Sequence, residues 1–131
     1  MRTIDTETII KTVSEMCIEA SHFLTPDMKE ALSKATESEI SPLGKQVLDQ
    51  LSENLRIAGE DMIPICQDTG MAVIFAEVGS DVHVEGNLTD AINEGVRRGY
   101  VDGYLRKSVV SDPLLRVNTG DNTPAVIHYD I

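Results

Sequence analysis

The sequence predicts an α/β (α+β) fold, in which an N-terminal layer of about three helices packs on a small mixed sheet with a further helix. Two observations predict it. The first 60 residues place apolar side chains at the spacing of one buried helix face. Beyond residue 63, short apolar runs bounded by glycine and proline replace that pattern, as is typical of strands. With 131 residues and no linker, one domain over residues 1–131 is the simplest organisation.

Three helices are expected before residue 60. The first covers residues 9–20, with Asp5 or Thr6 available to cap its start. The second begins at Pro26 and the third at Pro42, and each proline follows a Thr or Ser that can serve as N-cap. The third helix has the strongest amphipathic pattern, with apolar positions at Leu43, Val47, Leu48, Leu51, Leu55 and Ala58.

The sheet is expected to use residues 71–84 and 125–131, with a fourth helix between them. Asn87 or Thr89 can cap that helix. Its end should be weakened by three glycines, Gly95, Gly99 and Gly103. An irregular connection over residues 103–124 follows. Because the sequence stops inside a predicted strand, which would leave an open pairing edge, we expect it to be truncated at its C-terminus.

Composition and charge narrow the function classes. Hydrophobic residues make up 41% of the chain and charged residues 25%, as in globular proteins. The net charge of −11 argues against binding DNA or RNA. No stretch approaches the roughly 18 apolar residues of a membrane-spanning helix, and the N-terminus lacks the apolar core of a signal peptide. We therefore expect a cytoplasmic protein with neither nucleic-acid nor membrane partners.

The basic residues after position 60 are confined to one stretch of 20 residues. These five are Arg97, Arg98, Arg106, Lys107 and Arg116. Arginine offers a planar fork of donors to carboxylates and phosphates, so this stretch could bind a small anion. It is equally consistent with a solvated basic helix end and loop.

The segment Pro64-Ile65-Cys66-Gln67-Asp68-Thr69-Gly70 places a cysteine directly before a polar turn. A thiolate beside the Gln67 amide and the Asp68 carboxylate suits an iron or iron–sulfur centre that also handles a polar substrate. The alternative is a turn with a partly buried cysteine. Cys17 lies on the apolar face of the first helix and reads as a core residue. The three histidines, His22, His83 and His128, have no metal-ligand spacing and read as structural.

A second polar segment precedes the last predicted strand. Residues 117–124, VNTGDNTP, are rich in turn formers and in side-chain hydrogen-bond donors. This segment could line a site, or it could be a well-capped loop.

Three motifs together resemble the class I (iron–sulfur) fumarate hydratase α subunit or N-terminal region. They are PICQDTGMAVIFAEVG, YLRKSVVSDPLLR and RVNTGDNTPAVIHYDI. The related L-tartrate dehydratase α subunit is similar too, but the fumarase branch fits better. The resemblance implies reversible hydration of fumarate to L-malate, a reaction of the tricarboxylic acid cycle, at a [4Fe–4S] cluster with one open iron.

The resemblance also implies roles for individual residues. Cys66 would be one cluster ligand. Gln67 and Asp68 match a substrate-contacting pair, and Asp68 is a candidate catalytic residue for proton transfer. Arg106 matches an arginine that clamps a substrate carboxylate. The open iron would act as a Lewis acid.

One family-matching cysteine cannot hold a [4Fe–4S] cluster, so the resemblance implies that ligands come from elsewhere. The expected partners are the remaining α region and a β subunit or C-terminal domain, and we expect this segment to be inactive by itself. We also expect a homo-dimer. Two alternatives remain: an L-tartrate dehydratase α subunit, or a non-catalytic binding or assembly module with the same fold.

Overall fold

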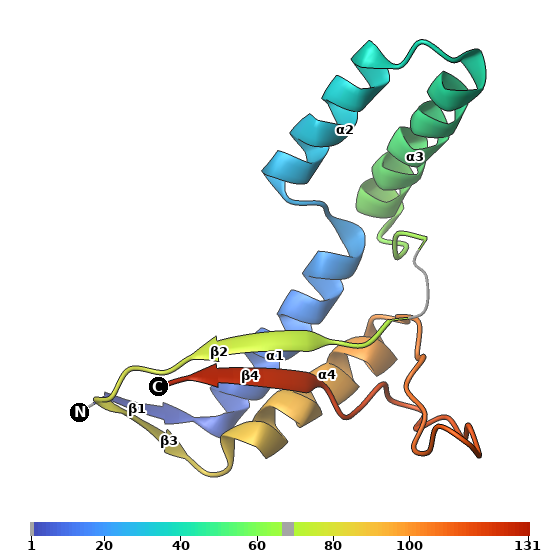
Figure 1. Cartoon of the computed structure of the whole chain (residues 1–131). Helices are drawn as coiled ribbons and strands as arrows, with labels where there is room; N and C mark the ends of the chain where they lie inside the picture. Colours follow the sequence, from blue (N-terminus) through green and yellow to red (C-terminus); the bar gives the residue numbers. More distant parts are fainter. Residues whose placement is uncertain (1, 67–69) are drawn as a thin grey trace. The chain divides into compact units, whose positions relative to one another are not determined.

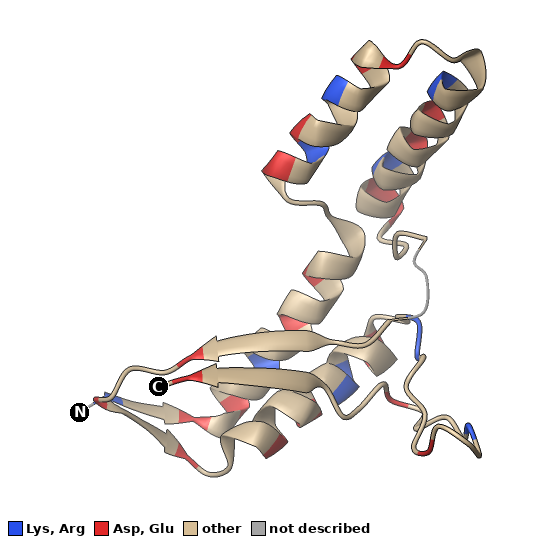
Figure 2. Ribbon diagram, in the orientation of Figure 1, with Lys and Arg blue, Asp and Glu red and all other residues tan. Residues whose placement is uncertain are grey.

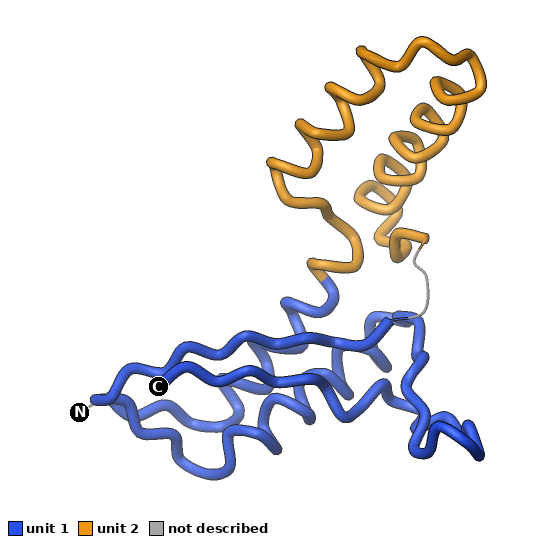
Figure 3. The backbone as a smooth tube through the Cα atoms, viewed as in Figure 1, with its two compact units in different colours: residues 1–18, 67–131 blue, residues 19–66 orange. Residues whose placement is uncertain are grey.

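The computed structural model describes residues 2–66 and 70–131, which form two compact units. Unit 1 comprises Met1–Ile18 and Gln67–Ile131, and unit 2 comprises Glu19–Cys66 (Figure 3). In chain order the elements are β1 (Arg2–Asp5), α1 (Thr6–His22), α2 (Pro26–Ser38), α3 (Pro42–Asp61), β2 (Val73–Glu77), β3 (Val82–Glu85), α4 (Leu88–Asp102) and β4 (Val126–Asp130) (Figure 1). This mixture of helices and strands confirms the predicted α/β class, whereas the single-domain organisation stays a prediction.

The predicted starts of the helices at Pro26 and Pro42 are confirmed, but the side chain of Thr25 forms no capping hydrogen bond with α2. Asp5 caps α1, because its Oδ1 accepts a 2.7 Å hydrogen bond from the Thr8 N–H. Asn87 caps α4, with its Oδ1 accepting from the Asp90 N–H at 3.2 Å. Ser41 caps α3, because its Oγ accepts a hydrogen bond from the Gly44 N–H. In the part of the chain that the structure describes, no helix combines the length and hydropathy that crossing a bilayer requires.

The strands form two parallel pairs rather than the one mixed sheet expected from the sequence. β2 pairs with β4 over the full length of both strands, so the two stretches expected to meet do meet. β3 pairs instead with β1, with Val82 opposite Arg2. Strand β1 was not predicted, because four residues, RTID, carry too little pattern to be separated from the helix cap that follows.

In unit 1, α1 and α4 pack against one face of β2 and β4 (Figure 1). The buried cluster consists of Val13, Ala72, Ile92 and Val96, and the side chains packed on it include Ile74, Ala76, Ala125 and Ile127. The opposite face of the strands carries Phe75, which is 79% exposed and stacks on His128 with ring centroids 4.9 Å apart. This alternation gives the strand pair one buried and one open face.

The helix α4 contains two of the three glycines that were expected to weaken its end. α4 continues to Asp102, with Gly103 as its C-cap. Gly99 faces α1, where an added β-carbon would lie 2.9 Å from the Cys17 Cβ. Close packing between the two helices therefore accounts for a residue that helix propensity alone disfavours.

In unit 2, α2 and α3 form a helical hairpin joined by residues 39–41 (Figure 1). Within the described residues, α2 has no buried side chain and α3 has only Ala58. Three apolar residues of α3, Leu43, Val47 and Leu51, are 47–70% exposed. The amphipathic face predicted for the third helix is thus present, but unit 2 leaves much of it uncovered.

Candidate functional site

Cys66 is the last residue of unit 2, and hydrogen bonds join the backbone of residues 65–66 to two helices. The Cys66 N–H donates a 3.3 Å hydrogen bond to Asn54 Oδ1 of α3. One residue earlier, the Ile65 N–H donates to the Ser21 carbonyl oxygen of α1 at 2.8 Å. The Cys66 side chain is nevertheless exposed. The local fold therefore fixes the backbone and leaves the thiol accessible to a ligand.

An apolar cavity of about 540 Å³ adjoins Cys66 between α2 and α3. Its wall is formed mainly by aliphatic side chains, among them Met28, Leu32, Val47, Leu51, Leu55 and Ile65. Polar side chains in this wall are limited to Gln50 and Asn54, with Cys66 at the rim. Such a wall offers no cation to a carboxylate, so this cavity lacks the groups that a dicarboxylate requires.

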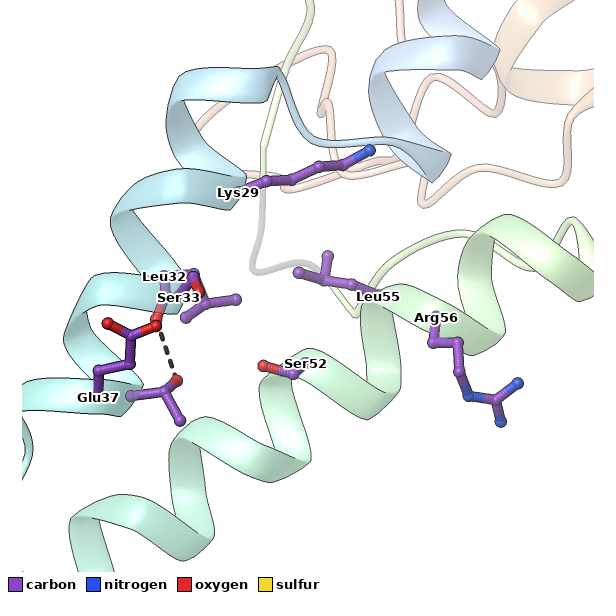
Figure 4. A pocket seen from close by; sticks show the side chains of 8 residues that line it. Lys29, Leu32, Ser33, Glu37, Ser52, Leu55 and Arg56 are labelled. Carbon is purple, nitrogen blue, oxygen red and sulfur yellow. Dashed lines mark hydrogen bonds between the residues drawn. The ribbon is translucent and has the colours of Figure 1, made fainter.

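A second cavity of about 440 Å³ lies on the same hairpin (Figure 4). Its arginine, Arg56, points away from Leu32 and Leu55 in this view. Arg56 forms hydrogen bonds of 2.9 and 2.7 Å with the Glu53 carboxylate and a further bond with Glu60. Because two carboxylates already neutralise this guanidinium, Arg56 is poorly suited to bind an anion here.

The described residues do not complete a metal centre. Gln67 and Asp68 lie outside them, so their predicted substrate and catalytic roles stay predictions. Over residues 2–66 and 70–131, no three His, Cys, Asp or Glu side chains gather as metal ligands would. Cys66 offers one thiolate, whereas a [4Fe–4S] cluster needs several. The described residues can therefore supply one ligand of such a cluster, Cys66.

Cys17 has the structural role expected from its sequence position. It is partly buried and packs on the core cluster of unit 1. Burial raises the pKa of its thiol to about 11, so the side chain stays protonated near neutral pH. A protonated thiol is neither a good nucleophile nor a metal ligand.

The basic stretch divides into two parts with different environments (Figure 2). Arg97 donates two bonds of 2.6 Å to the Glu94 carboxylate on the same helix. Arg98 donates to Glu94 at 2.8 Å and to Glu7 of α1 at 2.6 Å. Arg97 therefore forms an ion pair within α4, and Arg98 also joins α4 to α1. The other three cations of the stretch, Arg106, Lys107 and Arg116, follow the end of α4 at Asp102.

Arg106 and Lys107 lie in the loop between α4 and β4, directly after a buried residue. Leu105 is 4% exposed, and its N–H donates a 3.1 Å bond to the Tyr100 carbonyl oxygen. Arg106 is exposed and Lys107 is half-buried. The backbone is thus held on the N-terminal side of the two cations.

Two asparagines of the NTGDNTPA motif bind the backbone on the C-terminal side of Arg106. Asn122 is completely buried, and its Oδ1 accepts from the Ser108 N–H at 2.6 Å and the Val109 N–H at 3.0 Å. Asn118 Nδ2 donates to the Lys107 carbonyl oxygen at 3.0 Å. The motifs YLRKS and NTGDNTPA, separate in sequence, therefore meet in unit 1. Sequence reasoning singled out the second motif but not these two side chains.

Backbone conformation in this loop departs from the usual regions. Tyr104, Arg116 and Asn122 have φ values of 54°, 56° and 63°. Left-handed φ values are uncommon for residues other than glycine, and they are tolerated best by asparagine and aspartate. Three such residues in one loop indicate that its hydrogen bonds, rather than local preference, determine its path.

Asp121 completes the turn that precedes β4. Its Oδ1 accepts from the Thr123 N–H at 3.0 Å and from Thr123 Oγ1 at 2.8 Å. Burial acts to raise the pKa of this carboxyl, but the bonds from Thr123 and the Thr119 side chain, with the charge of Arg97, lower it overall. Asp121 is therefore ionised at neutral pH and acts as a turn cap.

The predicted site residues that the structure describes belong to different units. Cys66 belongs to unit 2 and Arg106 to unit 1. The structure brings the residues that follow Arg106, Lys107 to Val109, together with the NTGDNTPA motif.

The sequence model of the family described as "Fumarate hydratase (Fumerase)" matches residues 10–131. This range includes every site residue predicted from the sequence.

Similar curated proteins carry two kinds of name. A putative L(+)-tartrate dehydratase subunit alpha from Methanocaldococcus jannaschii is 35% identical over 90% of this chain and 44% of its own length. The anaerobic class I fumarate hydratase of Escherichia coli is 34% identical over 94% of this chain and 24% of its own. The L(+)-tartrate dehydratase subunit alpha of Escherichia coli is 32% identical over 74% and 32%, respectively. The chain spans less than half the length of these relatives.

Proposed function

Because this chain belongs to the fumarate hydratase family, we propose that it is the N-terminal part of a class I hydro-lyase that reversibly hydrates fumarate to L-malate. The extent of the family match carries this proposal, since residues 10–131 include both Cys66 and Arg106. Relatives named class I fumarate hydratase, at 34–35% identity, support the choice of substrate. We place the enzyme in the cytoplasm and its reaction in the tricarboxylic acid cycle.

Hydration adds the hydroxyl of water to one alkene carbon of fumarate and a proton to the other. The enzyme must hold two carboxylates and move one proton, with no net redox change. We propose that Arg106 binds one carboxylate through two parallel N–H···O bonds. Gln67 would contact the substrate through its amide, and Asp68 would contact it and transfer or direct the proton.

We further propose that Cys66 is one thiolate ligand of a [4Fe–4S] cluster. When bound, such a cluster with an open iron supplies a Lewis acid for substrate oxygens. Its other ligands have to come from regions beyond those described, because Cys17 is a protonated core residue. The exposed side chain and bound backbone of Cys66 are compatible with this role.

Completion of the site requires partners. We propose that the remaining α region and a β subunit or C-terminal domain supply the missing ligands and catalytic groups, and that this segment is inactive alone. The greater length of the relatives supports this proposal. The uncovered apolar residues of α3 support association, including a homo-dimer.

A second candidate is the α subunit of an L-tartrate dehydratase. Two relatives that carry this name, at 35% and 32% identity, favour it. Tartrate has one more hydroxyl than malate, so discrimination depends on polar groups that face that carbon. A third candidate, a non-catalytic assembly module with the same fold, predicts no cluster with any partner.

The deciding experiment measures hydration in an assembly of this segment with the downstream region, loaded anaerobically with iron and sulfide. Wild type is compared with Cys66→Ala and with Cys17→Ala as a matched control. We expect fumarate hydration and cluster absorption in wild type and in Cys17→Ala, and loss of both in Cys66→Ala.

Other outcomes identify the alternatives. Turnover of tartrate without fumarate would keep the family and change the substrate. Absence of a cluster in wild type, under conditions that load a known iron–sulfur protein, would favour the assembly module. Retention of the cluster in Cys66→Ala would remove this residue from the ligand set.

A further inference from the structure

We propose that Asn122 is a positioning residue for substrate binding, which holds the backbone that presents Arg106 and Lys107. This inference rests on the function proposed above and extends it to a residue that cannot touch the substrate. Asn122 has no exposed surface, so a ligand in solution cannot reach its side chain. Any effect of Asn122 on substrate binding has to pass through the residues it holds.

The contacts of Asn122 are directed at one short stretch of backbone. Its Oδ1 accepts from two consecutive N–H groups, of Ser108 at 2.6 Å and of Val109 at 3.0 Å. These are the first residues after the two cations. A single oxygen bound to two adjacent peptide groups fixes both the position and the direction of the chain at this point.

Neighbouring residues of the same motif extend the contact. Asn118 Nδ2 donates to the Lys107 carbonyl oxygen at 3.0 Å. The Thr119 N–H and Oγ1 both donate to the Val109 carbonyl oxygen, at 3.0 and 3.3 Å. The segment from Lys107 to Val109 is therefore bound on every residue by side chains or backbone of the NTGDNTPA motif.

Burial and backbone conformation explain why this position suits asparagine. At φ 63° most residues other than glycine, asparagine and aspartate are disfavoured. The bonding atom is the oxygen, because Nδ2 has no hydrogen-bond partner within the described residues. Burial raises the pKa of the Tyr100 hydroxyl, and the Asn122 side chain acts in the opposite direction. Aspartate should therefore preserve the contact, and glycine should remove it without backbone strain.

The consequence concerns the two cations. Leu105 is buried on one side and Ser108 is bound to Asn122 on the other, so Arg106 and Lys107 span two fixed points. A backbone held in this way lowers the entropy lost when the side chains bind an anion. It also fixes the position of the Arg106 backbone, from which the guanidinium extends. A displacement of a binding group by about 1 Å can lower activity roughly 100-fold.

The test uses the full enzyme that contains this segment and compares Asn122→Gly with Asn122→Asp. We expect Asn122→Gly to raise KM for fumarate by about 10- to 100-fold with kcat changed less than about threefold. Asn122→Asp should return KM to within about threefold of wild type, because it keeps the acceptor. Hydrogen exchange at the Ser108 and Val109 amides should accelerate in Asn122→Gly only.

A matched control is Asn93→Ala. Asn93 Oδ1 accepts from the Ala125 N–H at 2.8 Å, so it is another asparagine that holds backbone, but not the backbone of the two cations. It should alter stability without raising KM. If Asn122→Gly does not fold, Asn118→Ala serves instead, with a smaller rise in KM, because it removes only the bond to Lys107.

The outcomes separate this inference from the proposed function. Suppose that the wild type is active and that amide exchange at Ser108 is faster in Asn122→Gly. If KM is then the same as in wild type for both Asn122→Gly and Asn118→Ala, the positioning role alone is overturned. Equal rises in KM for the Asn122 and Asn93 variants would also overturn it, because the effect would then be general instability. A wild type that holds its Ser108 amide protected yet hydrates no dicarboxylate would overturn the proposed function, and the positioning role with it.

Discussion

Gly95 of α4 lies directly against Val13 of α1, so closely that a β-carbon added to the glycine would stand 2.6 Å from the Val13 Cβ. The same atom would lie 2.8 Å from the Ile10 carbonyl oxygen. Carbon atoms in contact prefer about 3.5–4.0 Å, so no side chain fits between these helices. The glycine therefore sets the distance between the two helices that cover β2 and β4.

Replacing Gly95 by alanine should destabilise unit 1, although alanine favours helix. We expect a loss of about 1–3 kcal/mol in the free energy of unfolding, because the helices must separate or Val13 must leave its rotamer. Urea denaturation followed by circular dichroism measures it. Gly79→Ala is the control, since its added β-carbon would meet only Val82 Cγ2 at an ordinary 3.7 Å. Equal stability of the two variants would contradict the packing argument.

Local patterns in the sequence predicted the helices well, because helix periodicity and caps are properties of neighbouring residues. Asp5 and Asn87 were expected as caps and act as caps. The pairing of β1 with β3 could not be obtained in this way, since the two strands are about 80 residues apart and meet through tertiary structure. The role of Gly95 was missed for the same reason: its partner is on another helix.

The site roles named from the sequence stay predictions. Cys66 and Arg106 were named from their motifs, whereas Asn122 was not, because its function is a contact with residues 13 and 14 positions earlier. Arg98 was grouped with a possible anion site, but its carboxylate partner Glu7 is 91 residues away. Contacts over such separations leave no periodic signal in a single sequence.

The two cysteines should differ sharply in alkylation. Cys66 is exposed, whereas burial raises the pKa of the Cys17 thiol to about 11. Because only the thiolate reacts, iodoacetamide at pH 8 should label Cys66 in the folded chain and leave Cys17 largely unmodified. Peptide mass spectrometry distinguishes the two positions, and both should react in denaturant. Rapid labelling of Cys17 in the folded chain would contradict its assignment to the core.

Two valines of α4 allow burial to be compared within one helix. Val96 has no exposed surface, whereas Val101 is 36% exposed. We expect Val96→Ala to lower the free energy of unfolding by about 1–3 kcal/mol through lost burial and an unfilled cavity. Val101→Ala should change it by less than about 0.5 kcal/mol. Chemical denaturation of both variants measures the difference, and similar losses would show that the core of unit 1 lies elsewhere.

Glu94 should contribute a pH-dependent part of the stability of unit 1. Hydrogen bonds from Arg97 first, and then from Arg98, lower the pKa of its carboxyl from 4.5 to about 2. A folded-state pKa below the unfolded value means that this contribution is complete above about pH 4.5 and disappears as the pH falls to about 2.

Glu94→Gln should therefore destabilise the chain at pH 7. It should also make the free energy of unfolding depend less on pH between about pH 2 and 4.5. The Glu94 side chain is 31% exposed and Arg97 44%, so solvent screening limits the loss to about 0.5–1 kcal/mol. Thermal unfolding at pH 7, 4 and 2 measures it, with Glu37→Gln as the control, since Glu37 is exposed and forms no ion pair with a described residue. A difference from wild type that persists unchanged at pH 2 would point to packing at Glu94 rather than to its charge.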